Sequence, residues 1–121
     1  GDTPKDRAVT HMMNRRAENR LVDAVGAYFH FATDGLGPEL ETYQNSDWGL
    51  RQREVAIQTM TYLDGVLSTS DFLAGDQFSM ADITAFAGLA FADFAKVDIP
   101  ENLHNLIKWR AQMAQRPSIA A

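Results

Sequence analysis

The 121-residue chain contains no cysteine. Disulfide bonds, thiolate catalysis and zinc sites with sulfur ligands are therefore excluded within this sequence. The lack of cysteine fits a reducing compartment, and no secretory signal opens the sequence, so we expect a cytoplasmic protein. The most apolar segment, 80–94, is only about fifteen residues long, whereas a bilayer span needs roughly twenty. This segment is therefore predicted to be a buried core helix, and no membrane is expected as a partner.

Positive charge is also scarce: 11 Lys and Arg stand against 16 Asp and Glu, for a net charge of -5. Because binding to nucleic acid depends on clustered basic residues, we expect no nucleic-acid partner. His11, His30 and His104 lie far apart and form no helical ligand pair, so no metal is expected. Gly-rich phosphate loops and nucleophile elbows are absent as well.

Alternating strand patterns are missing, and helical signals recur instead. Thr3 as N-cap followed by Pro4 predicts a first helix over residues 3–31, which the Gly- and Pro-containing run 34–38 ends. A second helix is predicted to begin at Asn45 or Ser46. Its expected apolar stripe consists of Trp48, Val55, Met60, Leu63 and Leu67.

The third helix has the sharpest start signal. Ser79 is the expected N-cap with Asp82 at the third helical position, which predicts a capping box. Phe78 and Ile83 occupy the two positions of a hydrophobic staple. The segment that follows is apolar on nearly all sides, which is typical of a helix in the middle of a bundle. A fourth helix over 101–115 completes the predicted fold, an all-α bundle with a central buried helix and one domain over 1–121.

Residues 72–83, Phe-Leu-Ala-Gly-Asp-Gln-Phe-Ser-Met-Ala-Asp-Ile, resemble the C-terminal signature of the glutathione S-transferases. Trp109 with the later Arg116-Pro117-Ser118, and the opening run 3–8, resemble the same family. The resemblance covers essentially the whole chain. It implies the all-helical C-terminal domain of that family, whose N-terminal thioredoxin-like domain is absent from these residues.

The resemblance implies that the parent enzyme conjugates glutathione, as co-substrate, to hydrophobic electrophiles, a transferase reaction used in detoxification. Because the absent domain carries the thiol-activating residue, the resemblance assigns no catalytic residue to this chain and implies that the chain alone is inactive. It also implies a homodimer. Neither the electrophile nor the class within the family can be read from these residues.

The family's first helix in this domain supplies the substrate wall and part of the dimer interface. Helical periodicity divides this helix into three stripes, of which one is assigned to the core: Ala17, Leu21, Ala24, Tyr28 and Phe31. The resemblance assigns a second stripe to the substrate and a third to the partner subunit. The residues expected to bind substrate are Glu18, Asn19, Val22, Val25 and Phe29. The residues expected at the dimer interface are Met12, Arg16 and Asp23. Val25 and Phe29 could instead be ordinary core residues, and the charged residues 15–20 could form a solvated face.

A second hypothesis is a non-catalytic module for protein–protein assembly. Helical domains of this type also occur in translation elongation factor gamma subunits and on some aminoacyl-tRNA synthetases. The mixture of charges on the first helix suits a polar interface as well as an enzyme dimer. A thioredoxin-like domain in the parent protein would favour the enzyme over the module.

Overall fold

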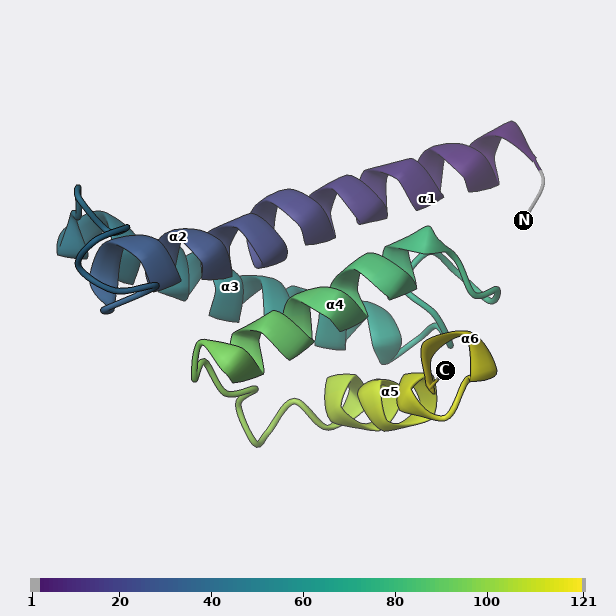
Figure 1. The fold of residues 1–121 in the computed structure, drawn as a ribbon. Coiled ribbons are helices and arrows are strands. Elements are labelled where there is room, and N and C mark those ends of the chain that lie inside the picture. Colours follow the sequence, from purple (N-terminus) through teal and green to yellow (C-terminus); the bar gives the residue numbers. More distant parts are fainter. Residues whose placement is uncertain (1–2, 121) are drawn as a thin grey trace.

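A computed structural model describes residues 3–120, and its elements are all helices (Figure 1). In chain order they are α1 (Pro4–Ala17), η1 (Glu18–Val22), α2 (Asp23–Ala32), α3 (Ser46–Leu67), α4 (Met80–Phe94), α5 (His104–Ala114) and α6 (Pro117–Ala120). Within the described residues the only β-type pairing is an isolated bridge between Phe72 and Gly75. The predicted all-α class is confirmed.

The first three elements form one long rod along the edge of the molecule (Figure 1). Thr3 caps the rod through a 3.1 Å bond from the Asp6 amide, as predicted. The middle of the rod differs from the prediction, because η1 is a π-helical turn. There the Asp23 amide donates to the Glu18 carbonyl, five residues earlier.

This π turn keeps one line of side chains in the core. Met13, Ala17, Leu21 and Val25 are all at most 2% exposed, and they follow one another at intervals of four residues. At about 100° per residue, an uninterrupted α-helix would rotate the last of them about 120° away from the first. One extra residue in a turn removes about 100° of that drift. Val25, which was expected on the substrate face, therefore lies in the core, in agreement with the alternative assignment as a core residue.

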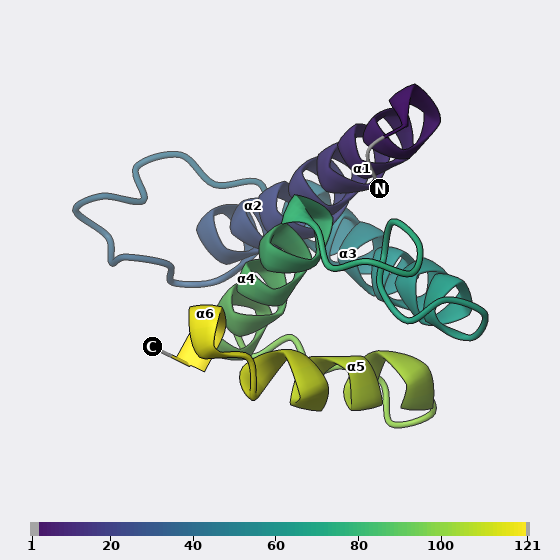
Figure 2. The same ribbon diagram turned by 90° about the vertical axis from the view of Figure 1, so that its right-hand side faces the viewer.

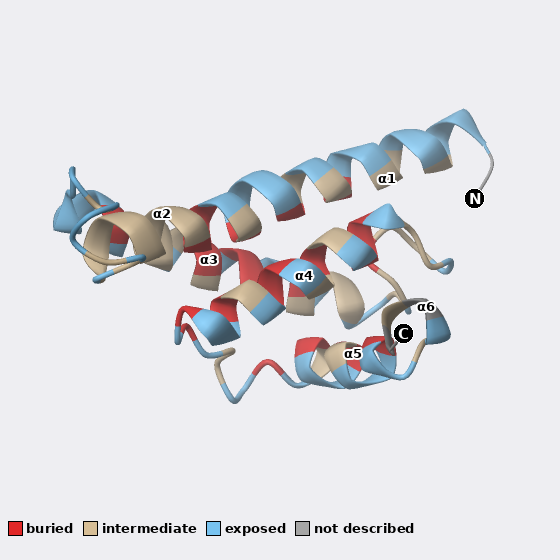
Figure 3. Ribbon diagram, in the orientation of Figure 1, coloured by how far each residue is buried: buried red, intermediate tan, exposed pale blue. Residues whose placement is uncertain are grey.

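Helices α3 and α4 both pack along the rod, and the core lies between them (Figures 1 and 3). Asn45 caps α3 by accepting the Trp48 amide at 3.1 Å, which confirms the predicted start. The predicted stripe on α3 is wrong at Trp48, which is 50% exposed, because the buried face of this turn is Gly49. A Cβ on Gly49 would lie 2.6 Å from the Cβ of Ala32, so the lack of a side chain allows α2 and α3 to approach closely.

The start of α4 contains a capping box between Ser79 and Asp82. The Ser79 amide donates to Asp82 Oδ2 at 2.9 Å, while Oδ1 accepts the Leu73 amide and the Trp109 indole, each at 3.0 Å. One fully buried carboxylate therefore joins the preceding loop, α4 and α5. Phe78 packs against the core, whereas Ile83 is 49% exposed.

Helix α5 begins three residues later than predicted and has no side-chain cap of its own. Asp64 of α3 accepts the Leu106 amide at 2.9 Å and so stabilises this helix end from another element. After α5, Pro117 begins the short α6. Just before it, the Arg116 guanidinium lies 3.9 Å from the centre of the Phe78 ring, which connects the last turn to the loop before α4.

Helix α4 lies between the rod and α5, as expected of a central helix, but one of its faces is open. Met80, Ile83 and Phe94 on this face are 63%, 49% and 67% exposed. The loop between α2 and α3 projects from the bundle and exposes further apolar side chains (Figure 2). None of the helices between residues 3 and 120 has the length and apolar character to cross a bilayer.

Candidate functional site

The residues assigned to the dimer interface lie mainly around one open hollow on the rod. Met12, Arg16 and Asn19 line this hollow of about 520 Å³, together with Arg15 and Arg20. Arg16 is held in place by the Tyr62 ring of α3, whose centre lies 4.2 Å from the guanidinium carbon. Asp23 is exposed but lies outside the hollow. The surface is basic and half-apolar, which suits contact with another polypeptide.

The residues assigned to the substrate wall are divided among four environments. Glu18 and Asn19 are exposed on the π turn, and Asn19 shares the hollow just described. Val22 is partly buried beside Gly88 of α4, where a Cβ would lie 3.1 Å from Val22 Cγ2. Val25 has no exposed surface, because the π turn rotates it into the core. Direct contact of Val25 with a ligand would therefore require the rod to rearrange.

Phe29 lines a separate cavity where the ends of α2 and α4 meet. The cavity has a volume of about 300 Å³, and its apolar part includes Phe29, Phe94 and Tyr28. The Phe29 and Phe94 rings are 5.5 Å apart, and Phe91 lies 6.0 Å from Phe29. The rim carries Thr33, Asp34, Gly35 and Lys96.

The contribution of α4 to this cavity could not be predicted from the sequence. Phe94 belongs to the segment predicted to be a buried core helix, yet it is 67% exposed, and it lies 65 positions from Phe29 in the sequence. Local periodicity identifies faces of single helices, but it cannot show which helix ends meet. For Lys96, which follows the end of α4, no local signal was available.

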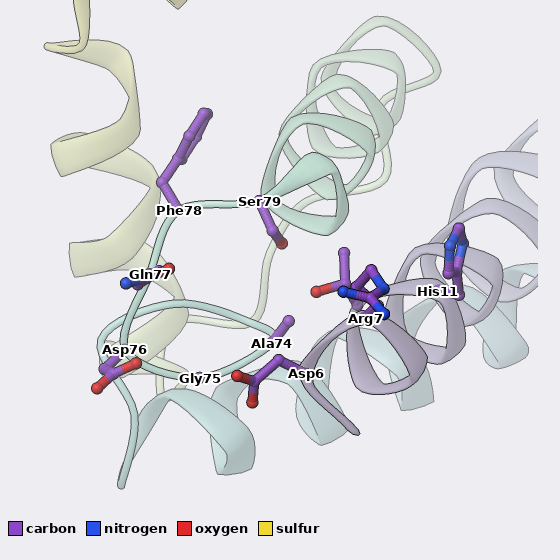
Figure 4. Close-up of a pocket in the computed structure, with 10 residues that line it drawn as sticks. Asp6, Arg7, His11, Ala74, Gly75, Asp76, Gln77, Phe78 and Ser79 are labelled. Carbon is purple, nitrogen blue, oxygen red and sulfur yellow. The ribbon is translucent and has the colours of Figure 1, made fainter. Parts of the chain in front are cut away.

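A third hollow lies between the first turns of α1 and the loop before α4 (Figure 4). This cavity of about 360 Å³ is lined by Asp6, Arg7 and His11 from the helix and by residues 74–79 from the loop. Acidic and basic side chains are mixed around it. Within the described part of the chain, no three His, Asp or Glu side chains gather into a possible metal site.

Comparison with known proteins identifies the family of this chain. The family model for the glutathione S-transferase C-terminal domain matches residues 51–117, which are more than half of the chain. The chain belongs to the glutathione S-transferase family. Glutathione S-transferase 2 of Saccharomyces cerevisiae is 55% identical over 119 residues, which are 98% of this chain and 51% of that protein.

Two solved glutathione S-transferase structures have the same fold as this chain. A glutathione S-transferase domain-containing protein of Marinobacter aquaeolei is 64% identical, with a TM-score of 0.94 over 98% of this chain and 58% of its own. Gtt2 of Saccharomyces cerevisiae is 54% identical, with a TM-score of 0.96 over 99% of this chain and 58% of its own. The chain thus spans about half the length of these relatives, and its fold as a glutathione S-transferase C-terminal domain is established.

Proposed function

We propose that this domain supplies the apolar substrate wall of a glutathione transferase. The observation that carries the proposal is the aromatic cavity at Phe29. The chain that contains it belongs to this family and spans about half the length of its yeast relative. Concave sites lined by aromatic side chains with a few polar groups are typical of small-molecule binding. Phe29 is the wall residue best placed to contact an electrophile. Val22 packs beside Gly88 of α4 and so helps to hold the rod against that helix.

The reaction proposed for the parent protein is thiol conjugation. The glutathione sulfur, as the thiolate, attacks an electrophilic carbon; a carbon–sulfur bond forms and the leaving group departs with its electron pair. The thiol proton is removed in a thioredoxin-like half, which residues 1–121 do not include. This chain contributes no catalytic residue, and its role is to bind and orient the electrophile.

The open face of α4 is the surface on which we propose that the thioredoxin-like half docks. Met80 and Ile83, with the exposed Ala87 and Ala90, recur at positions that share one side of a helix. Exposed apolar side chains in such a continuous row mark contact surfaces. Small alanines in the middle of the row would allow a second helix or a sheet to approach closely.

We further propose that the parent is a homodimer joined through the hollow on the rod. Met12 and Arg16 supply an apolar contact and a positive charge there. Asp23, the first residue of α2, is exposed further along the rod. In this arrangement Asn19, with Glu18 beside it, would reach the glutamyl amine of glutathione bound by the partner subunit. The exposure of both side chains on the π turn is compatible with that reach.

The proposal is tested by comparing two proteins with the same assay. Reduced glutathione and a chloronitroarene are mixed with this chain or with the full-length endogenous protein. We expect conjugate formation with the full-length protein and only the uncatalysed rate with the chain. Turnover by the chain alone would contradict the assigned division of labour. An inactive full-length protein that binds neither compound would favour the assembly module instead.

A further inference from the structure

Lys96 occupies a backbone conformation that normally belongs to glycine. Its φ of 62° is the only positive value at a non-glycine residue in the described chain. The residue follows the end of α4, where the Lys96 amide donates to the Asp93 carbonyl at 3.0 Å and the Val97 amide to the Ala92 carbonyl at 2.8 Å. This helix ending places its left-handed position at Lys96, and glycine is strongly preferred there because it has no Cβ. A lysine at this position costs backbone stability relative to glycine, although its positive charge is favourable beside the C-terminal end of α4.

Lys96 is also one of the residues that line the aromatic cavity. The negative groups nearby are explained by the fold. Asp34 belongs to a turn in which its carbonyl accepts the Gly37 amide at 2.9 Å, and aspartate is common in turns. Asp93 pairs with Arg110, and Glu41 accepts from His30 at 2.9 Å. Lys96 is the one basic residue among those that line the cavity.

The floor of the cavity is suited to a flat ring. Phe29 and Phe94 lie 5.5 Å apart with their planes inclined at 52°, and most of the Phe94 surface is open to solvent. An added aromatic ring can pack against both of these side chains. The volume of about 300 Å³ is at the small end of ligand cavities, enough for one or two fused rings with a substituent.

From these contacts we infer that the cavity selects an aromatic electrophile that carries an anionic group, with the ring on Phe29 and Phe94 and the anionic group on the Lys96 ammonium. Lys96 is then a specificity-determining residue. The inference rests on the proposed function, because Phe29 belongs to the proposed substrate wall, and it adds the charge of the substrate. Without Lys96 the cavity disfavours anions, because Asp34 is at the rim and the negative ends of the α2 and α4 dipoles meet there.

The experiment measures binding of two probes of the same shape, 2-naphthoate and the neutral 2-naphthamide, to this chain by titration calorimetry at low salt. We expect 2-naphthoate to bind about three- to fivefold more tightly, as suits one partly exposed ion pair. Lys96→Gly should reverse the preference in favour of 2-naphthamide, while Lys96→Arg should retain it. Lys5→Ala, which removes a distant exposed lysine, is the matched control and should change neither affinity.

Two further variants separate the ring contact from the charge contact. Phe94→Ala should weaken both probes to a similar degree, and Asp34→Asn should tighten 2-naphthoate alone by about twofold. Because glycine adopts the positive φ of this position without strain, the Lys96→Gly variant should fold, and a change in its binding preference can be assigned to the lost charge. The inference is overturned if the chain binds neither probe at millimolar concentration, or if Lys96→Gly leaves the preference for 2-naphthoate intact. Failure of conjugation by the full-length protein, with the preference still present, would remove the proposed function and leave an anion-selective aromatic site.

Discussion

Asp82 is the residue on which the three segments around α4 depend. Its carboxylate is fully buried and accepts three hydrogen bonds from nitrogen donors, those of Leu73, Ser79 and Trp109. The sequence predicted the bond within the capping box, because that bond is local. It could not predict the Trp109 indole, which lies 27 positions further along the chain.

Replacing this carboxylate should destabilise the domain severely. We expect Asp82→Ala to lower the free energy of unfolding by about 3–5 kcal/mol, because buried donors lose their acceptor. Trp109→Phe removes a single donor and should cost about 1–2 kcal/mol. Urea denaturation measures both values, and the exposed Asp98→Ala serves as a control with a change below about 0.5 kcal/mol. A loss for Asp82→Ala no larger than that of the control would refute the three-way role of the carboxylate.

At the scale of the element, the two glycines of α3 provide a matched test of helix packing. Gly49 faces Ala32, whose backbone nitrogen would lie 2.8 Å from an added Cβ, whereas Gly65 has no atom within 4 Å of that position. Gly49→Ala should therefore destabilise the domain by about 1–3 kcal/mol through overpacking. Gly65→Ala should stabilise it by about 0.5–1 kcal/mol through helix propensity. Thermal unfolding distinguishes the two, and equal effects would show that the α2–α3 contact is not close.

The π turn in the rod provides a second test at this scale. Deleting Asn19 should convert η1 into ordinary α-helix and leave the buried residues on both sides in place, at a cost below about 2 kcal/mol. Deleting Gln58 from α3 is the matched comparison, since it rotates the following turn by about 100° and moves Met60 and Leu63 out of the core. That variant should fail to fold, as judged by circular dichroism. If both deletions were equally damaging, the extra residue would not lie in the π turn.

The elements themselves were largely predictable, because their signals are local. Thr3, Asn45 and Ser79 each cap a helix at or next to the position expected from the sequence. Two features differ from the prediction, the start of α5 and the π turn η1, and the cause of each lies in another part of the structure. Helix α5 takes its cap from Asp64 of α3, and η1 exists because the core requires residues at intervals of four. A single-helix pattern contains neither piece of information.

For the whole molecule, family and fold could be predicted from the twelve-residue motif at 72–83, while the site could be predicted only in part. Phe29 does line a cavity, but Val25 is buried, because the π turn rotates it into the core and a regular 3.6-residue pattern does not include that turn. The other side of that cavity comes from Phe94 and Lys96, and their proximity to Phe29 depends on how α4 packs. The exposed apolar groups on α4 support the proposed docking surface for a thioredoxin-like half.

The central claim, that this domain works as one half of a glutathione transferase, is tested most directly by the intact mass of the endogenous protein. Mass spectrometry of the protein isolated from its source cells should give about twice the 13.5 kDa of this chain, since the chain matches 51% of the yeast relative. A mass of that size, with glutathione conjugation by the same preparation, is the predicted result. A mass near 13.5 kDa would show that the chain functions alone and would contradict the account.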